Sequence, residues 1–207
     1  FRGGQKIMKI VFFGDSITEA NRNAADPASL GDGYVSILHE KLKNLYEDVA
    51  FECLNRGVGG NSVSDLAARV QADVVAEKPD IVVLLAGIND VWRLKEGQTF
   101  DASAFAADFE SILSAVRGSG AKLIVAAPFL FDVPDKRRFR RSFNEELGVL
   151  RPLAEKYADA YVALDEIFAG VSGSVGIAAY SADGVHPTHR ASRLIADNVI
   201  KKIRKFL

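Results

Sequence analysis

The chain has 207 residues, of which 48% are hydrophobic and 26% are charged, a composition that is ordinary for a globular protein. This length suits one domain and is too short for two domains of full size. The 26 Lys and Arg residues nearly balance the 27 Asp and Glu residues, so the formal net charge is −1. No apolar segment reaches the roughly 18 residues that span a bilayer. We therefore expect neither nucleic acid nor a membrane as a partner.

The chain starts with FRGGQKIMKI, which lacks the hydrophobic region of a signal peptide. We interpret residues 1–7, before Met8, as a remnant of protein expression and residues 8–207 as one domain. We expect the protein to be cytoplasmic. The single cysteine, Cys53, excludes an internal disulfide, and its apolar neighbours predict a buried thiol.

Five short apolar runs predict β-strands. In chain order they are KIVFFG (9–14), VAFECLN (49–55), DIVVLLAG (80–87), AKLIVAAP (121–128) and AYVALD (160–165). Such nearly continuous hydrophobic runs are typical of parallel strands that helices cover on both faces.

Segments with helical spacing alternate with these runs, and each places an apolar stripe on one side. The stripes are Val35, Leu38, Leu42 and Leu45; Leu66, Val70 and Val74; Phe105, Phe109, Ile112 and Val116; and Ala191, Ile195, Val199 and Ile203. Thr188 is the expected N-cap of the last helix. Strands that alternate with helices predict an α/β fold, a five-stranded parallel sheet in a three-layer α/β/α arrangement.

Polar residues follow the predicted strands, at the edge where ligands bind in parallel sheets. Gly14-Asp15-Ser16 follows the first strand, NRGVGGNS (55–62) the second and GIND (87–90) the third. The segment ADGVHP (182–187) precedes the last helix. Together these segments supply a hydroxyl, a glycine turn, an amide, a carboxylate and an imidazole.

Acyl transfer by a serine needs this set of groups. Ser16 is the candidate nucleophile, His186 the base that takes its proton, and Asp183 the carboxylate that orients the base. The backbone N–H groups of Ser16 and Gly60 and the side-chain amide of Asn89 are the candidate oxyanion donors. Simpler interpretations are that Ser16 caps a helix, that Gly60 only permits a turn, and that Asn89 closes a turn through the backbone.

The segments GDSIT, NRGVGG, GIND and DGVHP resemble, in order and rough spacing, the four sequence blocks of the SGNH (GDSL-type) hydrolases. The resemblance spans residues 13–187 and implies a flavodoxin-like sheet of order 2-1-3-4-5. It also implies the family's catalytic and oxyanion-hole roles for its matching residues: Ser16, Gly60, Asn89, Asp183 and His186. The G-x-S-x-G motif of the larger α/β-hydrolases is absent. Asp15 and Asp90 we interpret as residues that fix loops through backbone N–H groups.

Further segments, DGYVSILHEKL, GINDVWR and APFLF…RR, resemble intracellular bacterial acetylxylan esterases of this family, which remove acetyl groups from xylo-oligosaccharides. Trp92 is either a sugar-stacking or pocket residue or a core aromatic. Ala182 stands where such esterases often have an aromatic residue. The alternatives are a lysophospholipase or acyl-CoA thioesterase with the same machinery, and an inactive carbohydrate-binding relative.

We expect no metal ion and no cofactor, because the three histidines lack metal-binding spacing and a site of Asp183, His186 and His189 is disfavoured. The expected partner is a small-molecule or oligosaccharide ester. The basic run DKRRFRRSF (135–143) is interpreted first as a solvated helix start. A subunit contact of a homo-oligomer or a rim above the active site are the other interpretations.

Overall fold

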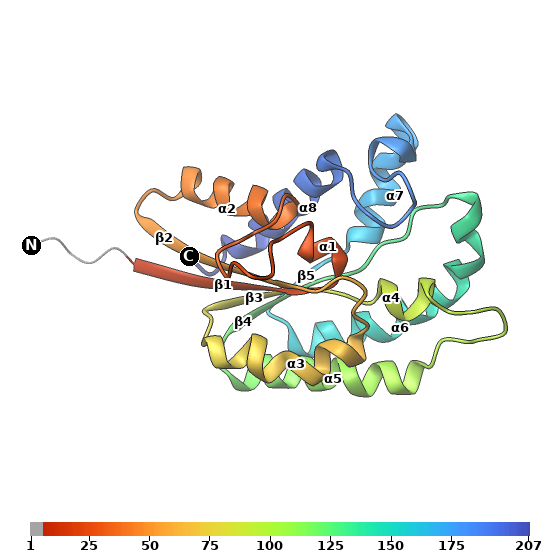
Figure 1. The fold of residues 1–207 in the computed structure, drawn as a ribbon, viewed down its shortest axis with the longest axis horizontal. Coiled ribbons are helices and arrows are strands. Elements are labelled where there is room, and N and C mark those ends of the chain that lie inside the picture. Colours follow the sequence, from red (N-terminus) through yellow and green to blue (C-terminus); the bar gives the residue numbers. More distant parts are fainter. Residues whose placement is uncertain (1–5) are drawn as a thin grey trace, which may run out of the picture.

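The computed structural model describes residues 6–207, in which five parallel strands form one sheet of order β2-β1-β3-β4-β5 (Figure 1). The strands are β1 (Lys6–Gly14), β2 (Val49–Gly57), β3 (Ile81–Leu85), β4 (Lys122–Ala126) and β5 (Ala160–Val162). The order and the parallel pairing confirm the predicted flavodoxin-like sheet. Three predicted strand segments extend too far: residues 86–87 and 127–128 lie in loops at the carboxyl edge, and Leu164 and Asp165 begin a helix.

The first strand starts earlier than Met8. Lys6 and Ile7, which we interpreted as part of a remnant of protein expression, pair with Val49 and Ala50 of β2. Residues 1–5 of that predicted remnant lie outside the described residues.

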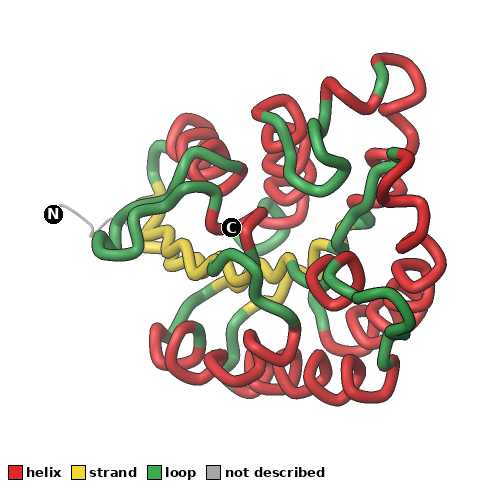
Figure 2. Tube along the Cα trace, turned by 45° about the vertical axis from the view of Figure 1, so that its right-hand side comes forward, coloured by secondary structure: helices red, strands yellow, loops and turns green. Residues whose placement is uncertain are grey.

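Helices cover both faces of the sheet, which gives the predicted three layers (Figures 1 and 2). One face carries α2 (Tyr34–Leu45), α7 (Leu164–Val175) and α8 (His189–Ile203), and the other carries α3 (Val63–Asp73), α5 (Ala102–Gly118) and α6 (Arg140–Tyr157). Two short helices, α1 (Ser16–Glu19) and α4 (Ile88–Trp92), follow β1 and β3 directly. The 3-10 helices are η1 (Val75–Glu77), η2 (Pro134–Phe139) and η3 (Ile177–Ala179). No helix within residues 6–207 has both the length and the apolarity to cross a membrane.

The predicted apolar stripes are buried, with one exception. Leu45 is 61% exposed, so its placement in the core is wrong. It is the last residue of α2, and Tyr46 beyond it packs its ring edge against Phe51 instead, with 6.3 Å between ring centroids. Thr188 caps α8 by accepting the N–H of Ala191 at 3.3 Å, as predicted. Cys53 is buried, and burial raises the pKa of its thiol to about 12.

Apart from the helix start at the basic run 135–143, the sequence pattern did not locate α6, and it did not locate α7. Helix α6 contains Gly148 and Pro152, and α7 contains Gly170 and Gly173, all residues of low helix propensity. Packing against the sheet, which fully buries residues such as Leu150 of α6, stabilises these helices instead. The basic run 135–143 forms η2 and the first turn of α6.

The end of β2 packs directly against α1. Gly57, the last residue of the strand, has no Cβ, and a Cβ there would lie 2.1 Å from the backbone N of Glu19. The buried Asn55 side chain donates to the carbonyls of Thr18 and Leu30, at 2.7 and 2.9 Å. Together these contacts hold α1 at the carboxyl edge of the sheet.

We expect Gly57→Ala to destabilise the protein, because the obstructing atoms belong to the backbone and cannot rotate away. Overpacking of this kind costs about 1–3 kcal/mol, which for a chain of this size lowers Tm by roughly 2–12 °C. Thermal unfolding followed by circular dichroism measures the effect. The matched control is Gly148→Ala, at an exposed helical position where a Cβ meets nothing within 4 Å, and it should leave Tm unchanged or raised. Equal Tm values for Gly57→Ala and the wild type would contradict the packing argument.

Candidate active site

The carboxyl ends of three strands lie side by side at one edge of the sheet. Gly14, at the end of β1, is opposite Gly57 of β2 and Leu85 of β3 in the strand register. The loops that leave these strands therefore begin next to one another. They carry the residues that the sequence predicted to converge.

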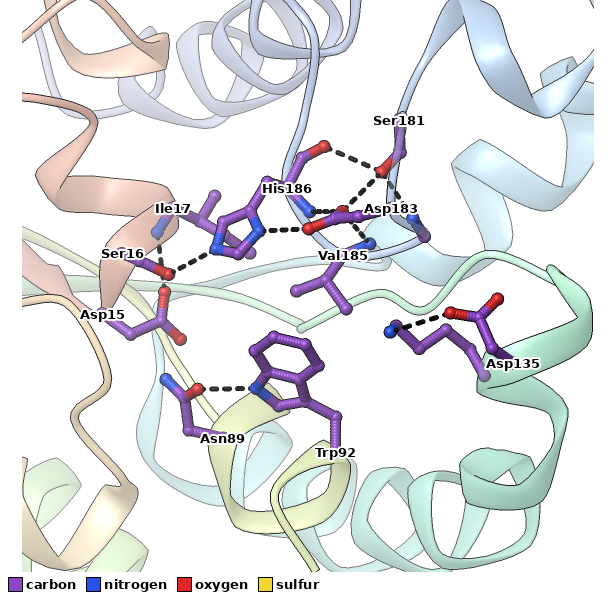
Figure 3. A network of polar contacts seen from close by, with 12 residues as sticks. Asp15, Ser16, Ile17, Asn89, Trp92, Asp135, Ser181, Asp183, Val185 and His186 are labelled. Atoms are coloured by element: carbon purple, nitrogen blue, oxygen red, sulfur yellow. Dashed lines mark hydrogen bonds and ion pairs between the residues drawn. The ribbon is translucent and has the colours of Figure 1, made fainter.

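Ser16 is the first residue of α1, and its hydroxyl is not used as a cap. The N-cap is Asp15, whose Oδ1 accepts the N–H of Ile17 at 2.9 Å. The capping interpretation of Ser16 is therefore wrong, and the interpretation of Asp15 as a loop-fixing residue is confirmed. Ser16 Oγ instead lies 3.0 Å from Nε2 of His186, a residue 170 positions away in the chain (Figure 3).

The other ring nitrogen of His186 contacts Asp183. Nδ1 lies 2.6 Å from Asp183 Oδ2, while Oδ1 accepts the backbone N–H groups of Val185 and His186 at 2.9 and 2.8 Å (Figure 3). Although partial burial opposes ionisation, the hydrogen bonds from the His186 ring and these two N–H groups lower the pKa of Asp183 to about 2. An ionised carboxylate can only accept, so Nδ1 carries the proton and Nε2 accepts from the Ser16 hydroxyl.

Ser181, which the sequence analysis did not single out, braces this loop. Its buried hydroxyl donates to the His186 carbonyl at 2.8 Å and accepts the N–H of Gly184 at 3.0 Å. Gly184 itself has a φ of +84°, in the left-handed region that favours glycine. The backbone between Asp183 and His186 is thus held in a turn that points both side chains to one side.

Asn89 lies in α4, is only 6% exposed, and is oriented by two fixed partners. Its Oδ1 accepts the indole N–H of Trp92 at 2.7 Å, and its Nδ2 donates to the carbonyl of Asn61 at 2.9 Å (Figure 3 shows the Trp92 contact). An indole N–H can only donate and a carbonyl can only accept, so the amide cannot be flipped. The simpler interpretation was that the Asn89 amide closes its own turn; the amide does bond to backbone, but in the loop that contains Asn61. The second N–H of the amide remains for a ligand.

Gly60 lies in the loop after β2 with a φ of +80°, so the turn does require glycine here. Its carbonyl accepts from Arg93 at 2.6 Å. The loop passes close to the serine, since a Cβ on the neighbouring Gly59 would lie 3.8 Å from Ser16 Cβ. Asp90 fixes the same loop from α4, because its carboxylate accepts the N–H of Val63 at 3.0 Å. The structure thus brings all five motif residues to one place.

A family described as GDSL-like lipase/acylhydrolase matches residues 12–194 of the sequence. The chain belongs to this family. Membership confirms the predicted resemblance to GDSL-type hydrolases. It also confirms the prediction that this chain is a carboxylic ester hydrolase.

Relatives of this GDSL-like chain align along nearly its whole length. An acetylxylan esterase from Geobacillus stearothermophilus is 30% identical, and the aligned region covers 94% of this chain and 93% of the esterase. Esterase TesA from Pseudomonas aeruginosa is 25% identical over 96% and 89% of the two chains. The crystal structure of an acetylxylan esterase from Geobacillus stearothermophilus matches with a TM-score of 0.86 and 29% identity, covering 95% of this chain and 94% of its own.

Trp92 is half-buried and tied into the site of this GDSL-like protein. Beyond its hydrogen bond to Asn89, its ring packs edge-on against His186, with 5.9 Å between centroids. The ammonium group of Lys136 lies 5.1 Å from the centre of the same ring. Trp92 therefore holds Asn89 and His186 in place, while its predicted role in sugar binding stays a prediction.

Three carboxyl groups lie close to the site, the buried Asp15 and Glu146 and the half-buried Asp90, and sequence reasoning missed Glu146. Glu146 of α6 is fully buried, and neither of its carboxyl oxygens has a hydrogen-bond partner among the described residues. A Cβ on Gly87, two residues before Asn89, would lie 2.3 Å from Glu146 Oε1. Burial raises the pKa of Glu146 well above its usual range, and the charges of Asp90 and Asp15 add to this. Burial likewise raises the pKa of Asp15 to about 7 and that of Asp90 to about 6.

We expect Glu146→Gln to change the pH dependence of stability. The folded protein keeps the Glu146 proton to a higher pH than the unfolded chain does, so the free energy of unfolding falls as pH rises through this interval. The amide of Gln has no proton to lose. The Tm difference, variant minus wild type, should therefore increase between pH 5 and pH 8, measured by thermal unfolding at several pH values.

The control for this experiment is Glu145→Gln, the exposed neighbour on the same helix, which should give a Tm difference that does not vary with pH. A Tm difference for Glu146→Gln that is flat from pH 5 to pH 8 would show that Glu146 is ionised in the folded protein.

Proposed function

We propose that this chain is a serine esterase that removes acetyl groups from carbohydrates, with acetylated xylo-oligosaccharides in the cytoplasm as substrates. The observation that carries the proposal is the hydrogen-bonded line from Ser16 through His186 to Asp183. Nucleophile and base are within hydrogen-bond reach, and the base is oriented by a third group, which is the arrangement that activates an alcohol.

The proposed reaction has two halves. Ser16 Oγ attacks the ester carbonyl carbon while His186 Nε2 takes the hydroxyl proton. The oxyanion of the tetrahedral intermediate accepts hydrogen bonds from the backbone N–H groups of Ser16 and Gly60 and from the side chain of Asn89. The intermediate collapses when His186 gives the proton to the departing sugar oxygen, which leaves an acetyl group on Ser16. In the second half His186 takes a proton from a water that attacks this ester, and it then gives that proton to Ser16 Oγ as the acyl–oxygen bond breaks and acetate leaves.

The relatives support this choice of residues and of substrate. Three Geobacillus structures, each with alanine in place of a serine, an aspartate or a histidine, are described as catalytic mutants of an acetylxylan esterase. Another is described as an acetyl-xylooligosaccharide esterase. The identity to these proteins, 28–29%, extends over 95% of the chain.

Replacement of the nucleophile gives the direct test. Ser16→Ala should lower kcat on acetylated xylo-oligosaccharides by at least about 10⁴-fold. It should also abolish labelling by a fluorophosphonate, which peptide mapping should locate at Ser16 in the wild type. The control is Ser174→Ala, an exposed serine of α7, which should keep both properties. Unchanged hydrolysis in Ser16→Ala would refute the proposal.

A series of p-nitrophenyl esters of increasing chain length tests the acyl group. A preference for octanoate over acetate would favour a lysophospholipase or thioesterase instead of an acetyl esterase.

Replacement of Asn89 tests the oxyanion donor. Asn89→Asp keeps the shape and the acceptor for Trp92 but loses the NH₂ group, so kcat should fall by roughly 10²–10³-fold with KM little changed. Steady-state kinetics on an aryl acetate measure both constants. Trp92→Phe is the matched comparison: it keeps a ring but frees Asn89 to rotate, so its kcat should fall less than that of Asn89→Asp. A kcat of Asn89→Asp within a few fold of the wild type would remove Asn89 from the oxyanion hole.

A further inference from the structure

A cavity of about 600 Å³ opens beside Ser16 and His186. Its wall comes from α1 and the turn after it, from Asp32 and Gly33, and from the start of α8, where His189 and Ser192 lie. The volume is within the range of small-molecule sites. The oxyanion residues Gly60 and Asn89 do not belong to its wall, so the cavity extends away from the oxyanion hole.

The chemistry assigns one part of the ester to this cavity. In the proposed reaction, which this inference depends on, His186 Nε2 gives its proton to the departing alcohol oxygen. The alcohol part must therefore leave on the side that His186 faces, away from the donors that hold the carbonyl oxygen. His186 and the adjacent Pro187 line the cavity, so the cavity receives the alcohol.

Glu19, the last residue of α1, lines this cavity, and its carboxylate lies against Gly59 in the loop after β2, close to the nucleophile. A Cβ on Gly59 would lie 2.6 Å from Glu19 Oε2 and 3.8 Å from Ser16 Cβ. Glu19 Oε2 and Ser16 Cβ are therefore at most 6.4 Å apart, which is the sum of these two distances. Within residues 6–207 the Glu19 carboxylate makes no hydrogen bond and no ion pair, whereas Asp32, the other carboxylate of the wall, accepts from Asn21 at 3.0 Å. Glu19 is thus a half-buried acceptor without a donor, in the wall of the cavity that Ser16 also lines.

We propose that Glu19 accepts a hydrogen bond from a free hydroxyl next to the ester on the alcohol part of the substrate. It thereby selects uncharged, polyhydroxylated alcohols. A carboxylate accepts a hydroxyl donor well, and hydrogen bonds to charged groups are stronger than neutral ones. The same charge repels a phosphate placed in the cavity, so Glu19 disfavours phosphorylated alcohols such as those of lysophospholipids.

The test combines a change in the protein with a change in the substrate. Two substrates are compared: a methyl xyloside with one acetyl group and a free neighbouring hydroxyl, and the same ester with that hydroxyl replaced by hydrogen. The measured quantity is the ratio of their kcat/KM values. The wild type should prefer the hydroxyl-bearing ester by about 10- to 150-fold, and Glu19→Ala should bring the ratio close to 1.

The control is Glu155→Gln, at an exposed position of α6, which lies on the face of the sheet opposite α2 and α8 (Figure 1). This variant should keep the wild-type ratio. A wild-type ratio near 1, or a ratio that Glu19→Ala leaves unchanged, would overturn the role of Glu19 and leave the esterase proposal standing. A wild type that hydrolyses aryl acetates but neither xyloside would overturn the carbohydrate proposal and this inference with it.

A second comparison tests the charge of Glu19. The substrates are monoacetylglycerol and its phosphorylated counterpart, acetylglycerol phosphate. Glu19→Gln should raise kcat/KM for the phosphorylated ester relative to the neutral one, and the increase should shrink as salt is added. An unchanged ratio at low salt would rule out electrostatic selection by this residue.

Discussion

The contact between Ser16 Oγ and the His186 ring depends on the central position of β1 in the sheet. The chain passes from β1 to β2 on one side and then returns to β3 on the other, so β1 ends at the point where the direction of winding reverses. Loops diverge there and leave room for a ligand. The loops after β2 and β3 flank the serine, and the turn before α8 brings the imidazole over it. If β1 did not lie between β2 and β3, the loops that carry these groups would be separated.

Two kinds of electrostatic environment adjoin Ser16. Backbone and amide N–H groups are available where an oxyanion would form, while the buried Asp15 and Glu146 and the half-buried Asp90 lie nearby. Ionised carboxylates at these three positions would oppose negative charge on the ligand. Burial counters this by raising the pKa of Glu146 well above its usual range, that of Asp15 to about 7 and that of Asp90 to about 6. A protonated Glu146 is therefore compatible with an oxyanion nearby, whereas the N–H groups of Ile17 and Val63 offset charge on Asp15 and Asp90.

The site could be predicted from the sequence where its residues directly follow a strand. Ser16 and Asn89 come within a few residues of a strand end, and parallel strands bring such positions together. Glu146, Ser181 and Glu19 were missed, because their surroundings are created by packing between elements distant in the chain. The sheet was predictable from its apolar runs, whereas α6, with Gly148 and Pro152, forms because tertiary burial outweighs local propensity.

The two sides of the His186 ring differ in how much space they offer, and this bears on substrate choice. On one side Trp92 is tied to Asn89 by a hydrogen bond and packs edge-on against the ring (Figure 3), and the ammonium group of Lys136 lies over the indole. On the other side the ring borders a cavity of about 600 Å³. In the proposed mechanism the alcohol takes the open side, so the acyl group must fit beside a fixed indole. That asymmetry favours a small acyl group on a large alcohol, as in an acetylated oligosaccharide.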